Sequence, residues 1–89
     1  MRLQIGVMGS AGGGMASQIV ERCKELGRAI AEAGCALVTG GCPGLPHFAT
    51  MGCKERGGLT VGVSPALSQY EHVHRYGSPV DHIDVMIYT

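Results

Sequence analysis

The sequence has no excess of either charge, since seven lysine and arginine residues balance seven aspartate and glutamate residues. Nothing in this charge balance indicates the basic face that nucleic-acid binding normally requires, or an acidic tail. Long apolar runs are also missing, because glycine or lysine interrupts each apolar stretch well before membrane-spanning length. We therefore expect neither a nucleic acid nor a membrane as partner, and instead a small neutral or anionic molecule.

Paired cysteines are absent as well. The four cysteines, at positions 23, 35, 42 and 53, form no C-x-x-C motif and no spacing typical of a zinc site or of a secreted disulfide framework. The N-terminal residues Met1 to Ile5 lead into glycines rather than into the apolar core of a signal peptide. We therefore expect reduced thiols, and we predict a cytoplasmic protein.

Strand-like and helix-like segments alternate along the 89 residues, joined by short glycine-rich connections. The predicted strands lie at 3–8, around 37–38, at 59–64 and at 83–88. The predicted helices lie at 17–33, at 45–56 and, over one or two turns, within 68–75. Strands separated by helices imply parallel pairing through right-handed crossovers. The sequence thus predicts one partial α/β domain over 1–89, a Rossmann-like parallel sheet of about four strands with two to three flanking helices.

The helix predicted at 17–33 has one apolar side, formed by Ile19, Cys23, Leu26 and Ile30. Ser17 is a candidate N-cap, and Gly34 is expected to end the helix. Gly27 in its interior costs on the order of 1 kcal/mol relative to alanine. We expect close packing on the sheet to be the reason for this glycine.

Two glycine clusters follow the first two predicted strands: Gly9-Ser10-Ala11-Gly12-Gly13-Gly14 and Gly40-Gly41-Cys42-Pro43-Gly44. Glycine lets the backbone approach a ligand closely, and the start of the next helix offers unpaired amides. Because such sheets bind ligands at the carboxyl ends of their strands, we predict that both loops hold a phosphate. The predicted ligand-binding residues are Gly9, Ser10, Gly12, Thr39, Gly40, Gly41, Gly44 and Pro65. Replacing Gly41 by valine is expected to block the ligand.

The sequence does not match the common nucleotide-binding motifs when they are compared with it residue by residue. The first loop does not have the G-x-G-x-x-G spacing, and the second strand ends in Thr39-Gly40 without an acid for the ribose, which disfavours NAD. A P-loop requires lysine after its last glycine, whereas Met15 follows Gly14. ATP hydrolysis of the P-loop kind is therefore excluded.

Several short motifs occur in a characteristic order: Ile5-Gly6-Val7-Met8-Gly9-Ser10, Leu26-Gly27-Arg28-Ala29-Ile30-Ala31, Val38-Thr39-Gly40-Gly41, Gly44-Leu45-Pro46-His47-Phe48-Ala49 and Val61-Gly62-Val63-Ser64-Pro65. In this order the chain resembles the Rossmann-like family of LONELY GUY phosphoribohydrolases, misnamed lysine decarboxylases and molybdenum cofactor carrier proteins. The compact second loop favours the carrier branch. The resemblance implies a nucleoside monophosphate or the molybdenum cofactor as ligand, and a homo-oligomer, dimer or tetramer.

The hydrolases of this family carry a later Pro-Gly-Gly-x-Gly-Thr-x-x-Glu segment with the catalytic acid, and this segment is not found before Thr89. We therefore predict no catalytic residue, and we expect the chain to be the N-terminal half of such a domain, truncated or completed by another copy or chain. Three functions remain open: a binding module for a phosphate-bearing ligand, the front part of a phosphoribohydrolase that is inactive alone, or a non-catalytic assembly module.

The histidines predict no metal site. His72 and His74 share a face only in an extended segment, and with His82 they form no convincing ligand set. We interpret His47 as a half-exposed surface residue. Asp81 and Asp84 are interpreted as solvated or turn carboxylates.

Overall fold

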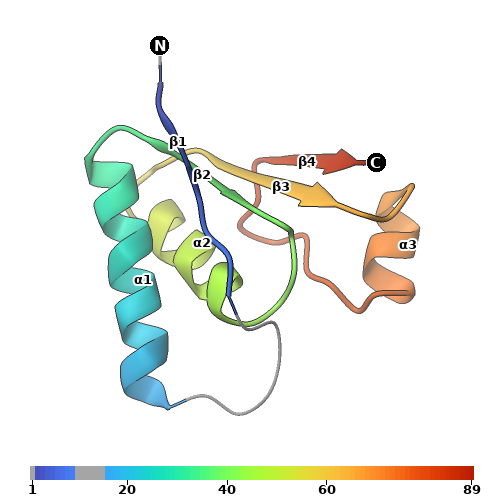
Figure 1. Ribbon diagram of the computed structural model, residues 1–89, viewed down its shortest axis with the longest axis horizontal. Coiled ribbons are helices and arrows are strands. Elements are labelled where there is room, and N and C mark those ends of the chain that lie inside the picture. Colours follow the sequence, from blue (N-terminus) through green and yellow to red (C-terminus); the bar gives the residue numbers. More distant parts are fainter. Residues whose placement is uncertain (1, 10–15) are drawn as a thin grey trace.

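The computed structural model describes residues 2–9 and 16–89 and confirms the predicted α/β order (Figure 1). The strands are β1 (Gln4–Gly6), β2 (Ala36–Thr39), β3 (Thr60–Ser64) and β4 (Val85–Tyr88). The helices are α1 (Ser17–Glu32), α2 (Leu45–Glu55) and α3 (Gln69–His74). The first strand is shorter than the predicted 3–8, although the amide of Val7 still donates to the carbonyl of Val38 at 2.8 Å. No helix in these described ranges is long and apolar enough to cross a membrane.

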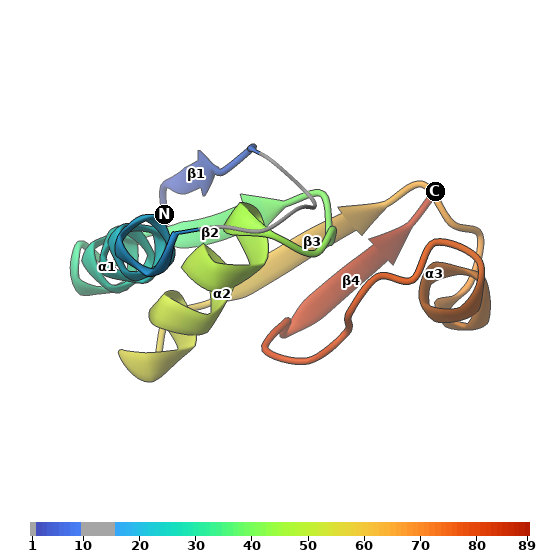
Figure 2. The ribbon, with the colours of Figure 1, turned by 90° about the horizontal axis from the view of Figure 1, so that it is seen from below.

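The four strands form one parallel sheet in the order β1-β2-β3-β4. Each strand is added beside the preceding one in the same direction, and right-handed crossovers then place successive connections on the same face. Helices α1 and α2 accordingly lie together on one side of the sheet (Figure 2). Helix α3 lies near the carboxyl ends of β3 and β4, and an extended segment leads from it back to the start of β4 (Figure 1).

Helices α1 and α2 approach each other so closely that two glycines are required where they touch. A Cβ at Gly27 of α1 would clash with the backbone carbonyl of Ala49 in α2, and a Cβ at Gly52 would clash with the carbonyl of Lys24. Glycine is the only residue that lets two helix backbones come this near. The expected contact of Gly27 with the sheet is therefore wrong, because this residue packs against α2.

The core lies between these helices and the sheet. Its buried members are Ile30, Cys35, Leu37, Ala49 and Cys53, with Val7 and Ala31 packed against them. The predicted apolar side of α1 is only partly confirmed, since Ile19 is 49% exposed and Leu26 is 47% exposed. The contact of α1 is centred on Gly27 and Ile30 instead, because the close approach of α2 decides which face is covered. The N-cap is Ala16 rather than Ser17, without a side-chain capping bond.

The other face of the sheet carries β-branched residues that remain partly exposed. Val63 of β3 pairs with Ile87 of β4, and Val61 pairs with Val85. Leu37, which faces the helices, is in register with Thr60, so alternation along β3 points Val61 and Val63 to the opposite side. Val63 is 39% exposed, and Val85 and Ile87 are each 47% exposed. We call Val61, Val63, Val85 and Ile87 the open face.

Asp84 connects three elements at the amino ends of β3 and β4. Its carboxylate accepts hydrogen bonds from the Thr60 amide at 2.9 Å and from Lys54 Nζ at 2.8 Å. The hydrogen bond from Lys54 lowers the pKa of Asp84, partial burial opposes this shift, and the bond from Thr60 adds to the lowering. Asp84 thus remains exposed, as the sequence predicts, and in addition links α2 to β3.

Candidate ligand-binding edge of the sheet

The loops after β1 and β2 meet at the carboxyl edge of the sheet. Gly9 is exposed, and a Cβ placed on it would lie 3.7 Å from Cβ of Leu45, the first residue of α2. This is an ordinary van der Waals distance, and Gly9 is not in the left-handed region. Among the described residues, an added Cβ at Gly9 would therefore make only ordinary contacts.

Helix α1 begins at the same edge. The amides of Ile19 and Val20 donate to the carbonyl of Ala16. The amides of Ser17 and Gln18 come before these hydrogen bonds and have no partner within the helix. The first turn of α1 contains no acidic residue. Its positive end is thus not neutralised by its own side chains. The predicted ligand residues Ser10 and Gly12, in the loop between β1 and α1, lie outside the described residues.

The second loop is folded inward at its start. The amide of Gly41 donates to Oγ1 of the buried Thr39 at 3.1 Å, so this amide is already bonded within the protein. Gly41 has φ of +72°, and its added Cβ would lie 3.1 Å from Cε1 of His72. Valine at this position would therefore disturb the packing itself, and the substitution expected to block a ligand cannot separate binding from folding. Gly40, beside it, is exposed.

The remaining predicted residues lie farther along the same edge. Gly44 has φ of +92° and precedes α2, and its carbonyl accepts the amides of His47 and Phe48. Because Pro46 has no amide hydrogen, α2 offers fewer free donors than α1. Pro65 is exposed and directly follows β3. The structure thus brings Gly9 and the start of α2 together and turns Gly41 inward, and the ligand contacts of all these residues stay a prediction.

The sequence did not reveal a buried polar network at the end of β3. His72 is 1% exposed, its Nδ1 lies 2.7 Å from Oγ of Ser64, and its Nε2 lies 2.8 Å from the carbonyl oxygen of Pro79. Because a carbonyl only accepts, Nε2 carries the proton, and a neutral ring then accepts the Ser64 hydroxyl at Nδ1. Oγ of Ser64 in turn accepts the amide of Ala66 at 3.1 Å.

This network anchors α3 and the segment after it to β3. Ser64 is 0% exposed, so no substrate reaches its hydroxyl in this conformation. A serine bonded to a histidine is also the arrangement of an activated nucleophile, but access is a condition of that chemistry. We therefore interpret Ser64 and His72 as structural. His72 lies in a polar stretch of the sequence, and no pattern there predicts that its side chain is buried.

The four-stranded parallel sheet and the helices packed on one of its faces define a Rossmann-like α/β domain. The chain belongs to the SLOG cluster4 family, whose model matches residues 2–89. This confirms the resemblance inferred from the motifs. Among curated proteins, none matches the chain.

Two groups of solved structures are similar over the whole chain. The molybdenum cofactor carrier protein from Chlamydomonas reinhardtii is 37% identical, with 99% of this chain and 50% of that chain covered and a TM-score of 0.80. The molybdenum cofactor binding protein from the phototrophic bacterium Rippkaea orientalis is 32% identical, with 100% and 50% covered and a TM-score of 0.79. The chain thus spans about half the length of these structures.

Proposed function

We propose that this chain binds a phosphate-bearing, nucleotide-like ligand of the molybdenum cofactor type, without chemistry of its own. The observation that carries this proposal is the meeting of exposed Gly9 with the start of α2 at Leu45, in a chain 37% identical to a molybdenum cofactor carrier protein. The backbone of a glycine can approach a phosphate closely, and the amides at the start of a helix can donate hydrogen bonds to the phosphate oxygens.

The described residues fit an anionic group at this edge. The first turn of α1 carries no acid that would repel a phosphate, and Gly9 leaves a space that a Cβ would occupy. We propose the amides of Gly9, Ser10 and Gly12 as donors, together with those of Ser17 and Gln18 in α1. Bound there, the cofactor would supply its phosphate as the anchor, while this chain binds and orients it.

A Gly9→Val variant tests the assignment of the first loop. Because an added Cβ at Gly9 meets only ordinary contacts among the described residues, we expect the variant to fold and to lose affinity by at least about tenfold, or about 1.4 kcal/mol. Calorimetric titration with AMP and with the molybdenum cofactor measures the change. The matched control is Gly6→Ala in β1, where an added Cβ meets nothing within 4 Å.

Two results would contradict this proposal at different levels. If neither ligand produced heat or a thermal shift with the unaltered chain at millimolar concentration, the proposed binding function would be wrong for this chain. If the Gly9→Val variant were folded and bound both ligands with unchanged affinity, only the placement of the ligand against Gly9 would be wrong.

We further propose a homo-oligomer, a dimer or tetramer, in which another copy covers the open face. Parallel sheets are normally buried on both faces, and Val85 and Ile87 are each 47% exposed. An Ile87→Lys variant is expected to shift the protein to a monomer in sedimentation velocity, because an ammonium group cannot be buried unpaired. Leu67→Lys is the control, since Leu67 is 79% exposed and lies outside the open face. A monomeric unaltered chain would contradict this proposal.

We also propose that the protein is cytoplasmic. All four cysteines are free thiols, and Cys35 and Cys53 are buried in the core. Unpaired thiols of this kind are usual in reducing compartments.

A further inference from the structure

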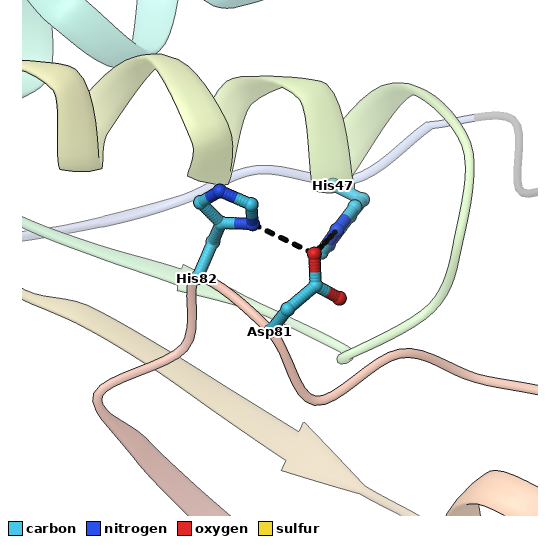
Figure 3. A group of neighbouring side chains, drawn as sticks. All are labelled: His47, Asp81 and His82. Carbon is cyan, nitrogen blue, oxygen red and sulfur yellow. Dashed lines mark hydrogen bonds and ion pairs between the residues drawn. The ribbon is translucent and has the colours of Figure 1, made fainter.

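Three side chains that could bind a metal meet beside α2. His47 belongs to the first turn of α2, whereas Asp81 and His82 belong to the segment between α3 and β4. Oδ2 of Asp81 lies 2.8 Å from Nδ1 of His82 and 3.5 Å from Nε2 of His47 (Figure 3). One ligand atom from each residue lies within 4.8 Å of the others.

These distances are close to those of a tetrahedral metal site. With zinc–nitrogen and zinc–oxygen bonds of about 2.0–2.2 Å, two ligand atoms of one tetrahedron lie about 3.4 Å apart. The two distances that involve Asp81 lie on either side of this value, at 2.8 and 3.5 Å. The two histidine nitrogens, at most 4.8 Å apart, need to approach by no more than about 1.4 Å. A rotation of the exposed His82 side chain supplies such a change.

The local backbone and the exposure of Asp81 support the same arrangement. His82 has φ of +64°, the only positive value for a non-glycine residue in the described part of the chain. This conformation places its ring against Asp81 and turns it toward α2 (Figure 3). Asp81 is exposed, so its carboxylate is accessible to an ion from solvent.

We propose that His47, Asp81 and His82 bind one divalent transition-metal ion, with Zn²⁺ as the best match. Two imidazoles and one carboxylate suit zinc and similar ions, whereas Mg²⁺ and Ca²⁺ prefer oxygen ligands. Three protein ligands leave the fourth position open, as in catalytic zinc sites. His82 also lines a surface hollow of about 320 Å³, so this ligand can be reached from solvent.

Metal titration of the whole chain tests the site without any cofactor. We expect one Zn²⁺ per chain with micromolar affinity by calorimetry, and a Co²⁺ complex whose absorption spectrum lacks thiolate-to-metal charge transfer. Each of the variants His47→Gln, Asp81→Asn and His82→Gly is expected to weaken binding by at least about 100-fold, the upper range for changes around a metal site. Glycine at position 82 keeps the left-handed backbone without strain.

The control is His74→Gln, which removes an exposed histidine of α3 that is not part of the cluster. It is expected to retain the affinity for Zn²⁺. The proposal is overturned if the unaltered chain does not bind Zn²⁺ at micromolar concentration, if a folded His82→Gly variant binds as tightly as the unaltered chain, or if Co²⁺ shows thiolate ligation. In each case the three residues form only a polar contact between α2 and the segment before β4.

Discussion

A Gly27→Ala variant is expected to lose about 2–3 kcal/mol of unfolding free energy, although alanine is the better helix former. The gain in helix propensity is at most about 1 kcal/mol. This gain is opposed by the clash of the new Cβ with the carbonyl of Ala49. The carbonyl is part of the backbone and cannot rotate away as a side chain can. Separating α1 from α2 would also loosen the core around Ile30. Overpacking of this kind typically costs about 1–3 kcal/mol and occasionally more.

Thermal and urea denaturation measure this effect, and for a domain of this size the midpoint temperature should fall by about 10–20 °C. Gly52→Ala is expected to act in the same direction, because its Cβ would clash with the carbonyl of Lys24. Gly6→Ala is the control with an unobstructed Cβ and should leave the midpoint almost unchanged. Stabilisation by Gly27→Ala would show that the two helices do not touch at this glycine.

A His72→Leu variant is expected to destabilise the protein by about 2–4 kcal/mol while conserving most of the side-chain volume. The substitution removes two hydrogen bonds and leaves the hydroxyl of Ser64 and the carbonyl of Pro79 without their partner. Each buried polar group left unpaired costs about 1–3 kcal/mol. Denaturation midpoints measure the loss.

The matched control for this variant is His74→Leu. His74 lies two residues after His72 in α3, and its side chain is exposed. It should change the stability only slightly, because no described network depends on it. Ser64→Ala should also destabilise, since it leaves the amide of Ala66 and Nδ1 of His72 unbonded. If His72→Leu and His74→Leu had equal midpoints, the buried network would not contribute to stability.

Most of the fold could be predicted because its signals are local. The helical period around Ile30, the stop at Gly34 and the alternation of strands with glycine turns depend only on nearby residues. The errors concern contacts between elements. Leu26 and Ile19 were expected in the core, but the close crossing of α1 with α2 left them exposed.

The candidate sites were predictable to different degrees. The carboxyl edge of the sheet follows from glycines placed after strands, and the structure brings Gly9 to the start of α2 as such a fold requires. The packing of Gly41 against His72 and Met86 could not be predicted, because these two residues are remote in sequence. The same holds for His47 and His82, which no metal-binding motif connects.

The sequence by itself determined the fold class, the order of the elements and the family, since hydrophobic periodicity, turn residues and short motifs are properties of contiguous residues. Only the tertiary structure decided that Gly27 packs on α2, that His72 is buried and bonded to Ser64, and that His47 meets Asp81 and His82. These contacts join residues that are far apart in the chain or in different elements. Their partners are set by how the elements pack, and no local pattern encodes that geometry.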